Sequence, residues 1–383
     1  MSNEKPNIPA GYKPSPLGPI PEDWEVKRIL DYAPLQRGFD LPTEKIVKGA
    51  YPVVYSNGIL NFHNEYKAKG PGVVTGRSGT IGKVTYVESD YWPHNTSLWV
   101  TDFKGNNPKY VYYTYKYMGL SKFASGSGVP TLNRNDVHVS KIAIPPIEEQ
   151  ERICNVLQLW DTAIAKQTAL IEKLTLRKRG LMQQLLTGKK RLKGFEGGSF
   201  RRLGNYISEC NRRNNGCNRV LSVTNTRGFI LQEEQFDKIV ASNDTSNYKV
   251  VRRGEFAYNP SRVNVGSLAM LKEYDEGILS PMYIVFKANE NIDTTYLLQC
   301  LQSWWFRGHI PAYTQGSVRD SLSFDGLCSM KFYIPTLQEQ KAISSILERA
   351  DKENEIQKQK LAALQEQKKG LMQVLLTGKR RIL

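Results

Sequence analysis

Few residues in this chain could build a disulfide framework, a metal site or a membrane span. Its 383 residues include four histidines and an odd number of cysteines, five, which are scattered without a CxxC pair. This pattern argues against disulfides and zinc and favours reduced thiols. No run approaches the 18 apolar residues of a membrane span, and the Pro-rich leader, residues 1–20, lacks the apolar core of a signal peptide. We therefore expect a cytoplasmic protein with no membrane partner.

Acidic residues are also scarce relative to basic ones. The 53 lysines and arginines exceed the 37 acidic residues by 16, and such an excess on a globular chain usually means a polyanionic partner. Nucleic acid is the first candidate. The alternative is generic solubilising charge, which acidic residues would supply equally well.

One segment occurs twice without gaps. Residues 144–192 and 334–382 are related by an offset of 190, and 20 of the 49 aligned positions are identical. The identities include Pro145/Pro335, Gln150/Gln340 and the whole LLTGK. This is an internal duplication, and each copy follows a longer non-helical stretch.

The duplicated segment has the periodicity of a coiled-coil helix. Apolar residues recur at alternating spacings of four and three, the seam of a heptad. The predicted apolar seam consists of Ile153, Leu157, Trp160, Ile164, Ile171, Leu174, Leu181 and Leu185 in the first copy and Ile343, Leu347, Leu361, Leu364, Leu371 and Leu375 in the second. Polar seam positions, such as Gln167, Asn354 and Gln357, favour one register and one pairing.

The two predicted helices are long and have defined ends. Acidic residues crowd each first turn, and Gly188 and Gly378 stand where the helices should end. At about 40 residues each helix would be roughly 60 Å long. The simplest way to bury both stripes is for the helices to pack on each other as an antiparallel coiled coil, which gives the chain a pseudo-twofold arrangement. A coiled coil that only dimerises the chain is the alternative.

The stretches before the helices, 21–143 and 193–333, read as α+β domains. They are rich in Gly, Tyr, Ser and Asn, with strand-like runs at 73–75, 83–87, 97–100 and 282–286 and short helices expected at 110–118 and 295–306. Weak equivalences join them: 70–84 parallels 253–268, and 125–133 parallels 314–322. We therefore predict two related domains, 21–143 and 193–333, each followed by a helical spacer, 144–192 and 334–383.

These features together resemble a known family. IPxxxEQ opens each long helix and KxGLMQxLLTGK closes it, and the first domain opens near PEDWEVKRI. The chain is similar, over essentially its whole length, to the specificity subunits of type I restriction-modification systems. The resemblance implies that the two variable domains are target recognition domains, each reading one half of a split double-stranded DNA site. It also implies that the helices dock two modification subunits, that these hold S-adenosylmethionine and methylate adenine, and that restriction and motor subunits complete the complex.

Polar residues in glycine-containing loops are the candidates for DNA contact. Arginine suits guanine edges, and asparagine suits adenine. Arg77 and Arg262 lie at places that the sequence alignment treats as equivalent, and they are the strongest pair. The first-domain candidates are Arg37, Asn57, Arg77, Ser78, Thr80, Lys83, Asn95, Asn133 and Arg134, and the second-domain candidates are Asn225, Arg227, Asn259, Arg262, Asn264, Ser317 and Arg319. The alternative for each is a structural turn or cap.

No sequence pattern indicates a catalytic, cofactor or metal site on this chain. Asn259-Pro260 begins like an amino-methyltransferase motif but continues with Ser261 and Arg262, and no GxxxxGK[ST] phosphate loop occurs. We predict a non-catalytic DNA-binding subunit whose helices hold the domains about one DNA turn, roughly 34 Å, apart. The competing hypothesis is a nonspecific nucleic-acid adaptor that recruits a partner through its coiled coil.

Overall fold

The chain folds into two compact units that share two long helices. The computed structural model describes residues 8–126, 130–235, 244–314 and 321–382. Unit 1 comprises residues 1–168 and 359–383, and unit 2 comprises residues 169–358. None of the described helices is both long and apolar enough to cross a membrane.

Unit 1 is built on two small antiparallel-rich sheets. The larger has the strand order β4 (Leu35–Arg37), β10 (Ser97–Val100), β7 (Gly72–Gly76), β8 (Val84–Val87). The smaller has the order β6 (Gly58–His63), β5 (Tyr51–Tyr55), β9 (Trp92–Pro93), with β5 and β9 parallel. Three further pairs are β1 (Tyr12–Lys13) with β2 (Ile20–Pro21), β3 (Glu25–Arg28) with β13 (Lys141–Ile144), and β11 (Ala124–Ser125) with β12 (Thr131–Leu132). The short helices are α1 (Ile29–Tyr32), α2 (Pro108–Met118) and α3 (Arg134–His138).

Unit 2 repeats the larger sheet with different residues. Its order is β15 (Ile207–Glu209), β22 (Ile284–Ala288), β19 (Phe256–Tyr258), β20 (Leu268–Met270). Strand β14 (Ser199–Arg202) pairs with β23 (Lys331–Ile334), β16 (Leu221–Thr224) with β17 (Gly228–Leu231), and β18 (Lys249–Arg252) with β21 (Glu276–Leu279). The short helices are α5 (Gln232–Gln235), α6 (Thr294–Gln302), α7 (Trp304–His309) and α8 (Phe324–Ser329). Both globular parts are mixed α and β, as predicted.

The short helices differ slightly from the sequence expectation. The helix expected at 110–118 is α2, whose N-cap Asn107 accepts hydrogen bonds from the backbone N–H groups of Lys109 and Tyr110. The helix expected at 295–306 is two helices, because Ser303 is extended (ψ 153°) and its side chain caps α7. The continuous helix predicted there was wrong.

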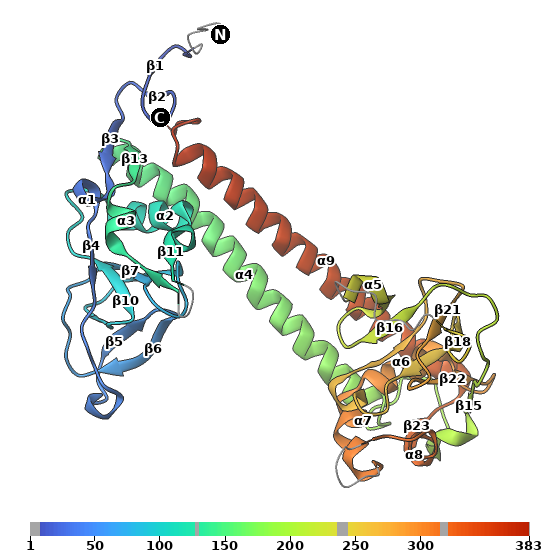
Figure 1. Ribbon diagram of the computed structural model, residues 1–383. Coiled ribbons are helices and arrows are strands. Elements are labelled where there is room, and N and C mark those ends of the chain that lie inside the picture. Colours follow the sequence, from blue (N-terminus) through green and yellow to red (C-terminus); the bar gives the residue numbers. More distant parts are fainter. Residues whose placement is uncertain (1–7, 127–129, 236–243, 315–320, 383) are drawn as a thin grey trace, which may run out of the picture. The chain divides into compact units, whose positions relative to one another are not determined.

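The two long helices are present as predicted (Figure 1). They are α4 (Ile147–Leu185) and α9 (Leu337–Leu375), each 39 residues long. Gly188 and Gly378 adopt φ values of +70° and +71°, the left-handed conformation that ends a helix and that glycine alone adopts readily. Within unit 1, Glu149 pairs with Arg381 and Asp161 with Lys368, so the two helix segments run antiparallel there.

The predicted seam positions are all buried or partly buried. Their partners, however, are not only the other helix. Ile153 and Leu157 of α4 enter one core with Tyr110 of α2 and with Met372 and Leu375 of α9. The expectation that the stripes are buried simply on each other is therefore corrected, because the start of each helix also packs on a globular part.

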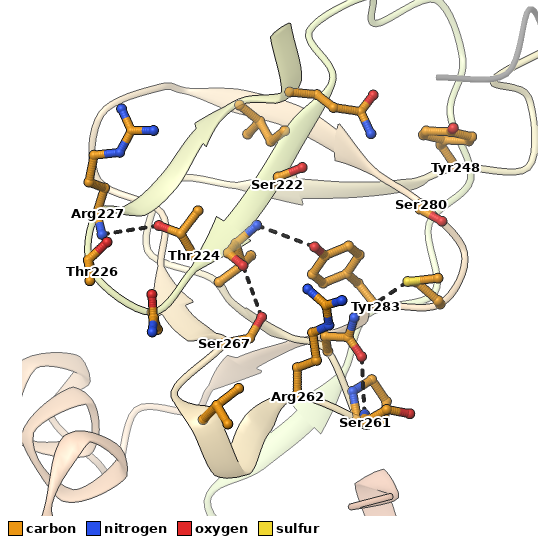
Figure 2. Close-up of a pocket in the computed structure, with 18 residues that line it drawn as sticks. Ser222, Thr224, Thr226, Arg227, Tyr248, Ser261, Arg262, Ser267, Ser280 and Tyr283 are labelled. Carbon is orange, nitrogen blue, oxygen red and sulfur yellow. Dashed lines mark hydrogen bonds between the residues drawn. The ribbon is translucent and has the colours of Figure 1, made fainter. Parts of the chain in front are cut away.

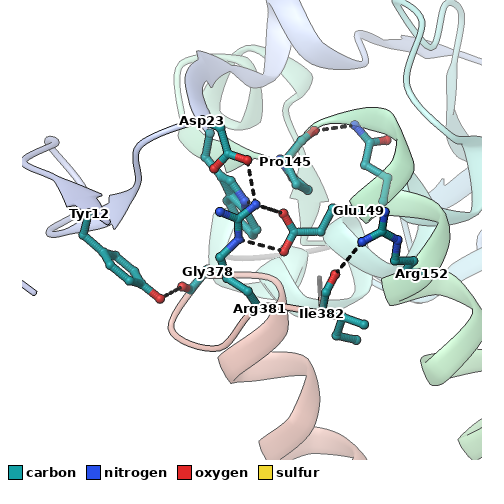
Figure 3. A network of polar contacts seen from close by, with 10 residues as sticks. Tyr12, Asp23, Pro145, Glu149, Arg152, Gly378, Arg381 and Ile382 are labelled. Carbon is teal, nitrogen blue, oxygen red and sulfur yellow. Dashed lines mark hydrogen bonds and ion pairs between the residues drawn. The ribbon is translucent and has the colours of Figure 1, made fainter. Parts of the chain in front are cut away.

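A buried ion pair fastens the end of α9 to the start of α4 in unit 1 (Figure 3). The Arg381 guanidinium donates to both carboxylate oxygens of Glu149, at 2.7 and 3.3 Å, and also to Asp23 at 2.6 Å. The indole N–H of Trp24 donates to the same carboxylate at 2.9 Å. In unit 2, two guanidinium nitrogens of Arg191 donate to the two carboxylate oxygens of Glu339. Glu149 and Glu339 are related by the offset of 190, as are Arg191 and Arg381, so the duplication preserves this ion pair. We call each pair, Glu149 with Arg381 and Glu339 with Arg191, a lock.

The repeated glutamine of IPxxxEQ has an equally specific role. The Gln150 side chain accepts from the backbone N–H of Asn107 at 2.9 Å and donates to the Pro145 carbonyl at 3.0 Å. Gln340 does the same for Asp293 and Pro335, at 2.8 and 3.0 Å. Asn107 and Asp293 are the N-caps of α2 and α6, so each glutamine joins a long helix to α2 or α6 of its own globular part.

Candidate nucleic-acid interface

In unit 1 the candidate loops meet at one end of the sheets. The loop between β7 and β8 carries Arg77, whose backbone N–H donates to the Thr96 carbonyl at 2.9 Å and whose carbonyl accepts from Leu132 at 2.8 Å. An ideal Cβ on Gly76 would lie 1.8 Å from the Thr80 oxygen and 2.7 Å from the Ser56 oxygen. The loops around residues 56, 77–83, 96 and 132 are therefore held together by backbone contacts.

Polar side chains line these loops. Lys83 donates to the carbonyl of Asn57, which lies in the turn between β5 and β6. Arg37 donates to Asp40 at 3.1 Å, and Asn95 donates to the same carboxylate oxygen. Ser78 and Thr80 lie in the loop beside Arg77, and Thr80 is exposed. The structure thus groups Arg37 with Asn95, Asn57 with Lys83, and Arg77 with its neighbours.

His94 lies among these loops and is held by local contacts. Its ring stacks at a tilt on Tyr55 with centroids 4.3 Å apart, and its Nδ1 is 2.9 Å from the Thr96 hydroxyl. Burial lowers the pKa of His94, and this outweighs the opposite effects of the Leu41 backbone and Asp40. The ring is therefore neutral at neutral pH and adds polarity without charge.

Asn133 has a structural role. Its side chain accepts from the backbone N–H of Asn135 at 3.0 Å and caps α3, of which Arg134 is the first residue. Because the cap uses the Asn133 carbonyl oxygen, the structure favours the capping alternative for this residue.

In unit 2 four candidates line one pocket of about 810 Å³ (Figure 2). Asn225 and Arg227 come from the β16–β17 turn, and Asn259 and Arg262 from the loop between β19 and β20. The lining, drawn from the described residues, contains two arginines and no carboxylate. Arg227 also pairs with Glu234 at 3.6 Å, so the pocket presents the positive charge of Arg262 together with hydrogen-bonding groups to a ligand.

The pocket walls are tied together by hydrogen bonds. The Ser267 hydroxyl donates to the Val223 carbonyl at 2.9 Å, and the Val223 N–H donates to the Tyr283 hydroxyl at 3.4 Å. The Asn259 side chain accepts from the Ser261 N–H at 3.1 Å. Arg262 is exposed, and its side chain points into the pocket (Figure 2).

Two second-domain candidates lie elsewhere. Asn264 does not line the pocket, and its side chain accepts from the Val265 N–H at 2.9 Å. Ser317 and Arg319 lie outside the described residues.

The loops of the two units correspond, but the two arginines do not. Gly76 N–H bonds to Lys83 in unit 1 as Asn259 N–H bonds to Ser267 in unit 2, both at 3.1 Å. The carbonyl that accepts from Leu132 belongs to Arg77, whereas the one that accepts from Leu322 belongs to Pro260. Pro260 therefore occupies the place of Arg77. The predicted equivalence of Arg77 and Arg262 was wrong by two positions, although both lie in the same loop of the repeated sheet.

A family profile described as type I restriction modification DNA specificity domain matches residues 21–176 and 206–366. The chain belongs to this family. The two matches together span most of its length, one over each globular part and the helix that follows it.

Relatives within the type I specificity family are similar along their whole length. The type I restriction enzyme MjaVIII specificity subunit of Methanocaldococcus jannaschii is 24% identical over 95% of this chain and 94% of its own. The putative MjaX specificity subunit of the same organism is 24% identical over 97% of both chains. The crystal structure of a type-I restriction-modification system S subunit from M. genitalium shares the fold, with a TM-score of 0.57 at 15% identity over 92% of this chain and 96% of that one.

The cysteines of this specificity-family member are free thiols. Burial raises the pKa of both Cys154 and Cys300 to about 12, which disfavours the nucleophilic thiolate. Among the described residues, no group of three or more His, Cys, Asp or Glu side chains could hold a metal ion.

Sequence reasoning missed the role of two carboxylates and two lysines that join each globular part to the long helices. Asp161 accepts from the Tyr113 hydroxyl at 2.7 Å and pairs with Lys368, and in unit 2 Asp351 accepts from Gln299 at 3.1 Å and pairs with Lys178. Each carboxylate joins α2 or α6 to both long helices. The identity of Asp161/Asp351 and of Lys178/Lys368 under the offset of 190 was the signal that could have found them.

Proposed function

We propose that this chain is the sequence-specific DNA-binding subunit of a type I restriction-modification complex, in which each unit reads one half of a bipartite target. One observation carries the proposal. The larger sheet has the same four-strand order in both units, while the loop between its third and fourth strands has different side chains in each. Reading two different half-sites requires a common fold whose loops carry different side chains in the two units.

Recognition is divided between charge and base contacts. Exposed lysines and arginines around the loops, such as Lys83 and Arg262, bind phosphates or guanine edges, and amides such as Asn225 suit adenine. Family membership and the net charge of +16 both support DNA as the ligand.

The long helices serve as the spacer in this proposal. α4 and α9 form an antiparallel coiled coil that sets the distance between the half-sites and docks two modification subunits. The repeated locks, Glu149 with Arg381 and Glu339 with Arg191, support this symmetric arrangement. Recognition domains at 21–143 and 193–333, separated by spacers at 144–192 and 334–383, complete the layout.

Catalysis belongs to the partners. The relatives of this family are named specificity subunits, and this chain contributes recognition rather than chemistry. S-adenosylmethionine binds the modification subunits, which methylate adenine, and restriction and motor subunits join them in the cytoplasm.

Methylation mapping tests the proposal. DNA from cells that carry this chain with its cognate modification subunit is sequenced by a single-molecule method, with the modification subunit alone as the control. We expect a split motif with methylated adenine in each half, absent from the control. Binding that is salt-sensitive but without sequence preference, and no methylated motif, would instead favour the nonspecific adaptor.

A further inference from the structure

One strand of unit 1 exposes apolar side chains. On β6, Ile59 is 41%, Leu60 58% and Phe62 51% exposed, and Val47 and Tyr66 beside its far end are 55% and 39% exposed. We refer to Val47, Ile59, Leu60, Phe62 and Tyr66 as the β6 patch. Contiguous exposed apolar groups on a folded protein mark interaction surfaces.

The backbone of β6 is irregular at the centre of this patch. Val53 pairs with Asn61 and Val54 with Ile59, so Leu60 has no partner on β5. This is a β-bulge, a device that re-aims a side chain and is enriched next to functional sites. Leu60 is the most exposed member of the patch.

The shared fold does not require this exposure. In unit 2 the hairpin β16–β17 follows the first strand of the larger sheet, as β5–β6 does in unit 1. Its apolar residues Leu221, Val223, Phe229 and Ile230 are only 1 to 5% exposed. Only one of the two hairpins therefore presents an apolar strand to solvent.

The charged residues around the β6 patch indicate which kind of ligand it binds. Between residues 44 and 69 the exposed charged residues are Lys45, Lys48, Lys67 and Lys69 against Glu44 and Glu65. At the other end of the hairpin Lys83 contacts Asn57, and Asn61 donates to the Tyr55 hydroxyl, whose ring packs on His94. The patch is therefore continuous with the candidate loops and flanked by cations, which suits a polyanion with apolar groups on its surface.

We propose that the β6 patch packs against thymine methyl groups in the half-site read by unit 1, while the lysines at both ends of the hairpin bind the flanking phosphates. The 5-methyl group of thymine is the apolar feature of the major groove, and side chains without polar atoms read it. This inference rests on the proposed function and adds the class of base that unit 1 reads.

Uracil substitution tests the contact directly. The chain in complex with its modification subunit is titrated against duplexes of the mapped target in which thymine is replaced by uracil, in one half-site and then the other. We expect Leu60→Ala and Phe62→Ala each to weaken binding of the thymine duplex about fivefold, from the loss of apolar contact. When uracil replaces thymine in the half-site read by unit 1, the same variants should change binding less than twofold. When uracil is placed in the other half-site, they should weaken binding as they do on the thymine duplex.

Leu30→Ala is the matched control, because Leu30 of α1 is also exposed, at 43%, in unit 1. It should bind both duplexes as the unsubstituted chain does. An equal loss on thymine and uracil duplexes would refute methyl contact, and no loss on either would remove the patch from the DNA interface. Weaker assembly with the modification subunit in the absence of DNA would assign the patch to that protein instead. Failure of the proposed function is distinct, since the unsubstituted chain would then show no sequence preference.

Discussion

Replacing Arg381 with methionine should destabilise unit 1 far more than a surface substitution would. Glu149 is 4% exposed and Arg381 24% exposed, so the change leaves a buried carboxylate whose one remaining side-chain donor, among the described residues, is the Trp24 indole. Removing one partner of a buried pair costs about 3 to 5 kcal/mol, and the partial exposure of Arg381 places this pair near 3 kcal/mol. For a unit of this size the loss corresponds to a fall in Tm of roughly 6–12 °C.

The test combines scanning calorimetry with a compensating variant. In Arg381→Met/Glu149→Gln the amide oxygen still accepts from Trp24 but no charge remains buried, so most of the lost stability should return. Arg191→Met is the matched change in unit 2, where Glu339 is 1% exposed. If Arg381→Met shifts the unit 1 transition by less than 2 °C, or if Glu149→Gln fails to restore it, the lock does not stabilise the fold as argued.

Three further predictions follow from contacts in unit 1. Asp161→Asn should cost about 2 to 3 kcal/mol in urea unfolding because it leaves the Lys368 ammonium, whose side chain is only 6% exposed, without its carboxylate partner, and Lys368→Met in the same chain should recover part of that loss; additive losses would contradict the coupling. Gly76→Ala should abolish methylation of one half-site, since its Cβ would meet the Thr80 oxygen at 1.8 Å; an unchanged motif would show that the loop adapts. Because burial lowers the pKa of His94 below the unfolded value of 6.5, unfolded chains bind the proton more tightly, so its contribution to stability is present above pH 6.5 and is lost as the pH falls below that value through the lower pKa of the folded chain. His94→Gln should flatten the fall in Tm between pH 7 and 5, and an unchanged slope would rule His94 out as its cause.

Local pattern predicted the long helices well because the heptad repeat and the terminal glycines act through neighbouring residues. The same reasoning failed at Ser303, where one capping hydroxyl splits a helix within an otherwise apolar run. It also misaligned Arg77 with Arg262, since the register of the two loops is set by backbone bonds to Leu132 and Leu322.

Long-range charge pairing could not be read from local pattern. Glu149 was interpreted as a helix-dipole residue, yet its partner Arg381 is 232 positions away. Similarly, only the tertiary structure distinguishes the exposed side chains of β6 from the buried ones of β16–β17. Which of the candidate side chains contact bases stays a prediction.

The division of the chain also has a consequence for synthesis on the ribosome. Unit 2 is one uninterrupted stretch, residues 169–358, whereas the core of unit 1 includes Met372, Leu375 and Leu376 from the other end of the chain. The half that is translated first therefore cannot complete its core until the last helix has emerged from the exit tunnel. During that interval the segment 1–168 exposes apolar surface that α9 later covers, so the order of translation and the order of folding are reversed.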